Sequence, residues 1–329
     1  MERIKAMTQI VQSEQRHNQG EQQLDSQVAR RAVEKQQRVI LVIVGVGSRS
    51  RVALCWADDF AHAMGMRVRL VHAALEKPVE PGGSQTDSAQ SAHQASWLAA
   101  LHEDFHGWAT FEAGVKLSLN DIRIAFAEPL DLILSEAAQP EVEMVVLDGL
   151  SALATEDGRN LPRQLLRQCP RPLLIIGPPG PRPVVIAATD CSDPALPVLR
   201  EAWRVAAALG DQIFLVHNID NEASQFAARV GMPMTPALAD IVVHRSREWL
   251  ESAAAINNIV ITRARDNSAG VLGAAQSMGA DLLVVGVKPD ARAPHRTAEQ
   301  ILANAQRSVL FVPFAGARTA ATAGQSHGP

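Results

Sequence analysis

The chain has 329 residues, of which 47% are hydrophobic and 20% are charged, and its formal net charge is -4. This length suffices for two domains of ordinary size, and the composition is that of a soluble globular protein and not of a disordered one. Without a large positive charge, general binding to nucleic acid or to an anionic lipid surface is disfavoured.

Two further features indicate where the protein acts. The opening residues lack the apolar core of a signal peptide, and no run reaches the roughly 20 apolar residues that span a bilayer. Cys55, Cys169 and Cys191 stand apart, with neither a disulfide framework nor the close pairs of a zinc site. We therefore expect a cytoplasmic protein with no membrane insertion and no metal site.

In chain order, residues 1–35 come first as a polar extension, in which Ile4, Met7 and Val11 have the spacing of a short amphipathic helix. From residue 36 on, short apolar runs rich in branched side chains alternate with segments of helical periodicity, which predicts alternating strands and helices. The strands expected in the first half lie at 38–45, 67–72, 120–126, 143–148 and 173–177.

The second half of the sequence repeats the first. Val39–His72 aligns without a gap on Val184–His217 at a constant offset of 145, and Gly65 meets Gly210 where each helix is expected to end. The last helix and strand of the halves also match, now at an offset of 136. The strands expected in the second half lie at 184–190, 212–217, 258–264, 281–286 and 309–313.

Strands that alternate with helices predict parallel sheets covered on both faces through right-handed crossovers. The segment GPPGPRP at 177–183 fits neither a helix nor a central strand and is the best domain boundary. We therefore predict an α/β chain with a first domain at 36–178, a second at 182–315 and a disordered tail at 316–329.

Three segments of the second half, VVIAATDCSDPA at 184–195, QIFLVH at 212–217 and DLLVVG at 281–286 followed by TAEQILANAQRSVLFVP, resemble the universal stress protein family in its tandem form. The resemblance covers about residues 38–314. It implies two doubly wound, five-stranded, adenine nucleotide alpha hydrolase-like domains related by a pseudo-twofold axis. It also implies that the last strands of the two domains pair with each other within the chain; a homodimer and an unknown protein partner are left open.

Nucleotide-binding members of that family carry an aspartate in the first loop and the motif G-x2-G-x9-G-S/T after the fourth strand, whose glycines let backbone N–H groups approach phosphate oxygens. Asp190 matches the aspartate and Gly286 the first glycine, whereas Pro289 stands at the second glycine. In the first half, Gly45 stands at the aspartate position and Leu147 at the first glycine. The resemblance therefore implies weak or absent ATP binding.

The basic loop KPDARAPHR follows the fourth strand of the second half and offers side chains that would bind an anion in place of the missing glycines. The alternative is an ordinary solvated loop. Together with the two motif residues, the candidate cofactor-binding residues are Asp190, Gly286, Lys288, Arg292, His295 and Arg296. An adenine nucleotide such as ATP is left open for the second domain. We expect no catalytic residues, because His72 and His217 lack a recognisable nucleophile motif and are expected to be structural.

Three functions are compatible with this sequence. The first is a non-catalytic, cytoplasmic regulatory binding protein of the stress-response type, with lost or weak ATP binding. The second is a nucleotide-binding protein with slow ATPase or phosphotransfer activity in the second domain. The third is a carrier of an apolar ligand between the domains.

Overall fold

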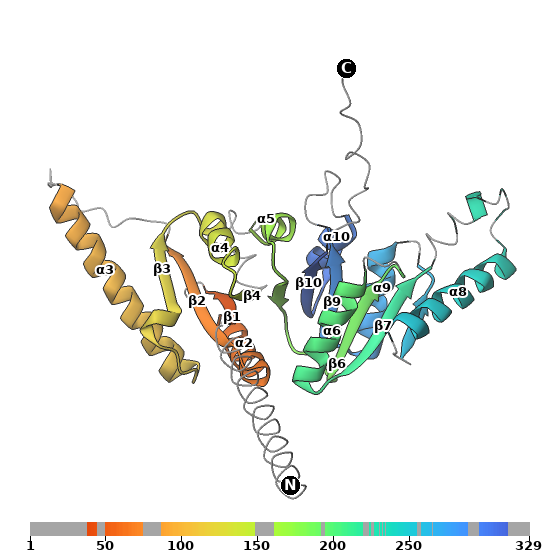
Figure 1. Cartoon of the computed structure of the whole chain (residues 1–329), viewed down its shortest axis with the longest axis horizontal. Helices are drawn as coiled ribbons and strands as arrows, with labels where there is room; N and C mark the ends of the chain where they lie inside the picture. The colour runs from red at the N-terminus through yellow and green to blue at the C-terminus, as the bar shows by residue number, and fades with distance from the viewer. Residues whose placement is uncertain are drawn as a thin grey trace, which may run out of the picture.

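The computed structural model describes residues 38–44, 50–74, 87–148, 161–191, 195–219, 235–254, 258–264, 266–288 and 296–314, with a few positions between 224 and 233. Within these residues ten strands form one continuous sheet in the order β3-β2-β1-β4-β5-β10-β9-β6-β7-β8 (Figure 1). The strands are β1 (Val39–Ile43), β2 (Arg67–Ala74), β3 (Ile122–Phe126), β4 (Val142–Asp148), β5 (Leu173–Ile176), β6 (Val184–Thr189), β7 (Gln212–Asn218), β8 (Ile259–Thr262), β9 (Leu282–Val287) and β10 (Ser308–Pro313).

The strand order reads the same from either edge if each strand of the second half is matched to its counterpart in the first. Neighbouring strands run parallel within each half. The predicted α/β class with parallel sheets is therefore confirmed, and the ten strands join into one sheet.

The joint between the halves is the antiparallel pair of β5 and β10, the last strand of each half. Phe311 lies opposite Leu173, and Leu310 lies opposite Leu174. Beside this joint the Arg167 side chain of α5 (Leu161–Gln168) forms an ion pair with Glu299 of α10 (Arg296–Asn304), at 2.5 Å between Nη2 and Oε1. The expected pairing of the last strands within one chain is thus present.

Helices cover both faces of the sheet. One face carries α2 (Ser50–Met64) and α6 (Leu196–Leu209), which also contact each other; the other carries α4 (Pro129–Ala137), α5, α9 (Asn267–Met278) and α10. Two longer helices, α3 (Asp87–Gly107) and α8 (Pro236–Ala254), lie towards the outer edges of the sheet (Figure 1). Because the central strands are buried on both faces, they read as continuous apolar runs.

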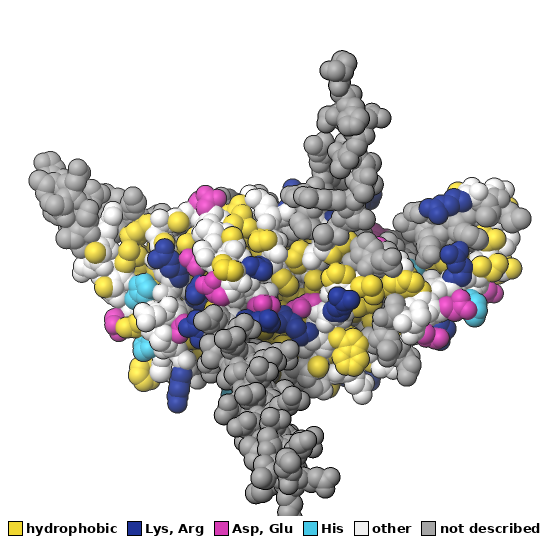
Figure 2. All heavy atoms as spheres, viewed as in Figure 1, with side chains coloured by type: hydrophobic (Ala, Val, Ile, Leu, Met, Phe, Trp, Pro, Cys, Tyr) yellow, Lys and Arg dark blue, Asp and Glu magenta, His cyan; other side chains and the backbone are white. Residues whose placement is uncertain are grey.

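Charged side chains of both signs are interspersed on the face of the molecule in Figure 2. Ion pairs join some charged side chains of the protein: Arg69 contacts Glu136 and Glu141, and Arg204 contacts Glu201. The side chains of these pairs are 15–31% exposed, so the pairs are partly buried.

The strand register corrects one part of the alignment between the halves. Ile40 lies beside Met144 and Val185 beside Leu282, so the residue of β4 that corresponds to Gly286 is Asp148 and not Leu147. The last strands give the same correspondence, because Asp148 lies beside Ile176 and Gly286 lies beside Val312, at the offset of 136. The ungapped alignment of 143–148 on 281–286 also places Asp148 on Gly286.

The segment between β5 and β6 is packed against the second half. The Gly180 N–H donates to the Asp281 carboxylate, and the Arg307 guanidinium donates to the Pro179 carbonyl oxygen. A Cβ added at Gly177 would lie 2.6 Å from the Arg307 carbonyl carbon, and one at Gly180 would lie 2.5 Å from the Ala280 oxygen. These two glycines are therefore required by close backbone contacts as well as by the turn.

Asp211 follows Gly210, the C-cap of α6, which has a φ of 74°. Burial, and then the charge of Asp281, raise the pKa of Asp211 above its usual 3.8. A raised pKa in the folded state means that the stability from this group is present below pH 3.8 and is lost as the pH rises through the folded pKa. The ionised side chain is therefore unfavourable at neutral pH.

We expect Asp211→Asn to raise the melting temperature at pH 7 by about 1–2 °C, the effect of roughly 0.5 kcal/mol in a chain of this size. The gain should shrink as the pH falls towards the raised pKa of Asp211, because the wild-type carboxyl then becomes neutral. Asp240→Asn is the control, because this exposed carboxylate is 3.3 Å from Arg263 and its removal brings no gain. Thermal melts between pH 4 and pH 8 test this; a gain that grows towards acid pH would contradict it.

Candidate functional site

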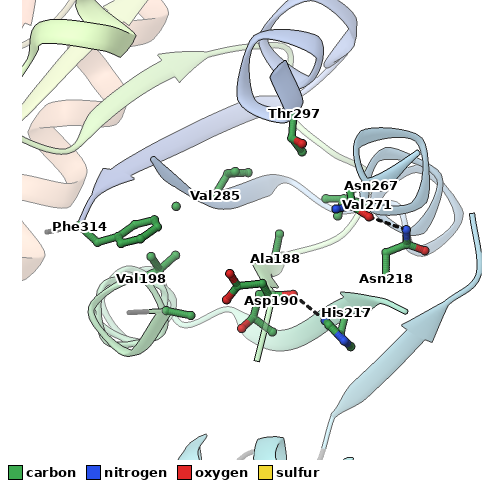
Figure 3. Close-up of a pocket in the computed structure, with 13 residues that line it drawn as sticks. Ala188, Asp190, Val198, His217, Asn218, Asn267, Val271, Val285, Thr297 and Phe314 are labelled. Atoms are coloured by element: carbon green, nitrogen blue, oxygen red, sulfur yellow. Dashed lines mark hydrogen bonds between the residues drawn. The ribbon is translucent and has the colours of Figure 1, made fainter. Parts of the chain in front are cut away.

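A cavity of about 460 Å³ lies in the second half, at the carboxyl ends of β6, β7 and β9 (Figure 3). Its volume is within the range of pockets that hold small ligands, about 300–1,000 Å³. In the sheet, β6 lies between β9 and β7. The chain continues from the end of β6 to β7 on one side, and from the end of β9 to β10 on the other side. Open α/β sheets bind ligands at such a reversal of the strand order.

Three helices begin at this cavity. Ala195 precedes α6, Asn267 is the first residue of α9 and Thr297 is the second residue of α10, and all three line the cavity. Because the first turn of a helix has unpaired N–H groups and a partial positive charge, the cavity favours ligand atoms that accept hydrogen bonds or carry negative charge.

One end of the cavity is polar and is organised by Asn218, whose side chain is 8% exposed. Its Nδ2 donates to the Ala264 carbonyl and to Asn267 Oδ1, each at 2.8 Å. Its Oδ1 accepts from the Ala264 N–H at 2.8 Å and from Thr262 Oγ1 at 3.2 Å. These four bonds use the full capacity of the amide, so Asn218 holds the strand ends together.

The same network sets the orientation of Asn267. Its Oδ1 accepts from Asn218, so its Nδ2 is turned away from Asn218 and faces the cavity in Figure 3. The Asn267 amide therefore offers hydrogen-bond donors to a ligand. Sequence reasoning missed both asparagines; the available signal was a polar residue at the carboxyl end of β7 and another at the start of α9.

The two histidines predicted to be structural make the same contact in each half. Nδ1 lies 2.8 Å from the Thr189 oxygen in His217 and 2.9 Å from the Val44 oxygen in His72. Since a carbonyl oxygen only accepts, Nδ1 carries the proton and donates in both cases. Each imidazole thus links its strand to the carboxyl end of the neighbouring strand, as expected of a structural histidine.

Asp190 lines the cavity from the loop after β6, and the backbone next to it is unusual. Cys191 has a φ of 55°, the only positive value at a non-glycine position among the described residues. Its N–H donates to Thr189 Oγ1 at 3.1 Å, which holds this turn. A left-handed conformation at such a residue is uncommon, so the loop is fixed in a shape that presents Asp190 to the cavity.

The other end of the cavity is apolar and surrounds Gly286. A Cβ at this position would lie 2.8 Å from Phe314 Cε1 and 2.9 Å from Val198 Cγ2. The Phe314 N–H donates to the Val287 oxygen at 2.9 Å, which fixes the start of this side chain. Gly286 is therefore required here by the packing of two apolar side chains on it.

The six candidate residues are distributed unevenly around the cavity. Asp190 and Gly286 line it, whereas Lys288 is exposed with its Nζ 6.0 Å from the centre of the Phe314 ring. Arg296, the first residue of α10, is also exposed and outside the lining. Arg292 and His295 lie outside the described residues.

Arg296 nevertheless acts on a neighbouring carboxyl. Hydrogen bonds from Ser268, and to a smaller extent the charge of Arg296, lower the pKa of Asp266. Asp266 is the N-cap of α9 and accepts the Ser268 N–H at 2.7 Å. Arg296 thus interacts electrostatically with the carboxylate of this N-cap residue.

In the first half, the position that corresponds to Gly286 holds a carboxylate. Asp148 is 5% exposed and is the only buried Asp or Glu among the described residues. The Asp148 side chain fills the space that a glycine would leave open to a phosphate group. The loops at 45–49 and 149–160, which include Gly45, lie outside the described residues.

The described part of the chain contains no cluster of three His, Cys, Asp or Glu side chains that could hold a metal ion. All three cysteines are free. None of its helices is both long and apolar enough to span a membrane.

Comparison with solved structures shows the fold of this chain in other proteins. A universal stress protein from Archaeoglobus fulgidus DSM 4304 aligns over 84% of this chain and 99% of its own, with a TM-score of 0.58 and 13% identity. The A. fulgidus universal stress protein in complex with dAMP aligns over 41% of this chain and 94% of its own, with a TM-score of 0.26 and 18% identity. A universal stress protein in complex with cAMP aligns over 40% and 97%, with a TM-score of 0.28 and 16% identity.

A search of curated proteins finds no match. The sequence profile of the universal stress protein family matches residues 182–313, from the end of the linker to the last residue of β10. This range contains every residue of the cavity lining except Phe314, which follows directly after it. Residues 182–313 of this chain therefore form a domain of the universal stress protein family.

Proposed function

We propose that the protein is a non-catalytic regulatory binding protein of the universal stress protein type, which acts in the cytoplasm and binds a small ligand in its second half. Binding of ATP is weak or lost in both halves. The chain is built as two domains, at 36–178 and 182–315, each with its own set of five strands. The three free cysteines suit a reducing compartment.

The observation that carries this proposal is how the polar side chains at the cavity form their hydrogen bonds. Asn218 spends all its hydrogen bonds inside the protein, and His217 donates from Nδ1 to a backbone oxygen. These hydrogen bonds stabilise the shape of the cavity. Asn267 and Asp190 then offer donors and a carboxylate to a ligand, which is the equipment for binding.

The loss of nucleotide binding has support in each half. The first half has the Asp148 carboxylate where a glycine would let a phosphate approach. The second half keeps Gly286, but apolar side chains cover it. The sequence adds Pro289, which has no N–H, at the position of the second motif glycine.

The alternative of an adenine nucleotide in the second half also has an observation in its favour. Three helix N-termini open on the cavity, and such termini attract phosphate groups. Slow ATPase or phosphotransfer activity would require a nucleotide that binds with its phosphates at these helix N-termini. The third alternative, an apolar ligand between the domains, has no such support, because the cavity lies within the second half.

Calorimetry with adenosine, AMP and Mg²⁺–ATP tests the proposal. We expect a nucleoside-sized compound to bind, and Asp190→Ala to weaken it about tenfold, the loss of one charged hydrogen bond. Asp240→Ala is the control, because this side chain is 75% exposed on α8, away from the cavity lining. Phosphate release from ATP should stay at the level of the buffer.

The opposite result would favour the alternative. Micromolar binding of Mg²⁺–ATP that Asp190→Ala abolishes, together with phosphate release above the buffer level, would contradict a non-catalytic role. Failure of all three compounds to bind would contradict a nucleoside-sized ligand in this cavity.

A further inference from the structure

The side chain of Phe314 occupies the place in the cavity where a motif glycine would otherwise face a phosphate. Two of its ring carbons, Cε1 and Cδ1, lie 2.8 and 3.1 Å from the Cβ position of Gly286. Figure 3 shows the Phe314 ring and Val198 turned towards each other at this end of the cavity. The space that glycine leaves open is thus filled by the protein itself.

The ring is held from two sides. The Phe314 N–H donates to the Val287 oxygen at 2.9 Å, which continues the pairing of β10 with β9 by one residue. The ammonium group of Lys288 lies 6.0 Å from the ring centre, within the range of a cation–π contact. Lys288 is the nearest basic residue to Gly286 in sequence, and its ammonium group lies over the Phe314 ring.

The two ends of the cavity differ in the chemistry that they accept. At the polar end Asn267 offers amide donors and Asp190 a carboxylate, which suit ring nitrogens, carbonyl groups and hydroxyl groups. At the other end Phe314, Val198 and Val285 form an apolar wall. A phosphate placed against that wall would lose its water without gaining donors, which is unfavourable.

We propose that Phe314 is a specificity-determining residue, which closes the Gly286 end of the cavity and selects neutral ligands of nucleoside size over phosphorylated ones. This inference rests on the proposed function, since it concerns the same cavity. It adds that a single side chain, and not only the altered glycine motif, decides against the phosphate.

The first test needs no ligand. Gly286→Ala should lower the melting temperature of the wild type, because its new Cβ would overlap the Phe314 ring. In a Phe314→Ala background the same change should lower it by clearly less, although Val198 still lies 2.9 Å away. An equal loss in both backgrounds would show that the ring does not occupy the Gly286 face and would overturn the inference.

The second test compares adenosine with Mg²⁺–ATP by calorimetry. Wild type should prefer adenosine, and Phe314→Ala should reduce the ratio of the two affinities about tenfold or more, because it opens the Gly286 face and releases Lys288. Phe314→Leu should keep most of the preference, since leucine still covers the glycine. Phe111→Ala is the matched control: this phenylalanine is 87% exposed and lies in the first half.

The outcomes separate the inference from the proposed function. Binding by the wild type with an unchanged ratio in Phe314→Ala overturns the role of Phe314 alone. Absence of binding by the wild type overturns the proposed function and, with it, this inference. Because Phe314 is only half-buried, the variant should fold, and its melting curve from the first test verifies this.

Discussion

Replacement of Phe311 by lysine is expected to remove the native state of the chain. Phe311 is 2% exposed and lies in β10 between Leu173 of β5 and Val285 of β9, at the joint of the two halves. A lysine there would bury a charge in an apolar cluster, which costs more than about 4 kcal/mol when nothing pairs with it. The total stability of a domain is only about 5–15 kcal/mol.

The measurement is soluble yield followed by unfolding in urea. Phe311→Lys should give little soluble protein, or protein without a cooperative transition, whereas Phe311→Leu should lose only about 1–2 kcal/mol. Phe111→Lys is the control, because its side chain is 87% exposed and should tolerate the charge. A Phe311→Lys protein that unfolds at the wild-type midpoint would refute the antiparallel joint.

Alanine in place of either linker glycine should destabilise the chain by about 1–3 kcal/mol, the usual cost of overpacking. At Gly177 and Gly180 the new methyl group would lie less than 3 Å from backbone atoms of Arg307 and Ala280, which cannot turn away as a flexible side chain can. The backbone on one side has to move in each case.

Gly273→Ala provides a control of opposite sign. This glycine lies within α9 and has nothing within 4 Å of its Cβ position. Alanine there should therefore stabilise the helix by up to about 1 kcal/mol. Urea unfolding of the three single variants checks both signs; equal stability of Gly180→Ala and wild type would mean that the linker is not packed as described.

The strands and helices of both halves could be predicted from sequence because they rest on local patterns. Apolar runs of strand length recur in the same order, and the offset of 145 aligns even the histidines that contact the preceding loops. The assignment of Leu147 to the Gly286 position was wrong by one residue, since both the strand register and the ungapped alignment of 143–148 on 281–286 place Asp148 there.

The cavity was only partly predictable for a related reason. Asp190 and Gly286 stand in recognisable positions of a motif, so sequence comparison finds them. The hydrogen bonds of Asn218 reach Ala264 and Asn267, which follow it by 46 and 49 positions in the sequence. Phe314, directly after β10, lies against Gly286 of β9. Such contacts depend on how strands and helices are placed in space, and no spacing along the chain predicts them.

The antiparallel joint of β5 and β10 has a consequence for how the protein responds to dilution. Both strands belong to one polypeptide, connected through residues 177–183, so their association is intramolecular and its effective concentration is set by the connector. The temperature at which the β5–β10 pair separates should therefore not depend on the protein concentration. If a protease cut within 177–183, the same joint would become a bimolecular contact between two fragments, and dilution would then favour their separation.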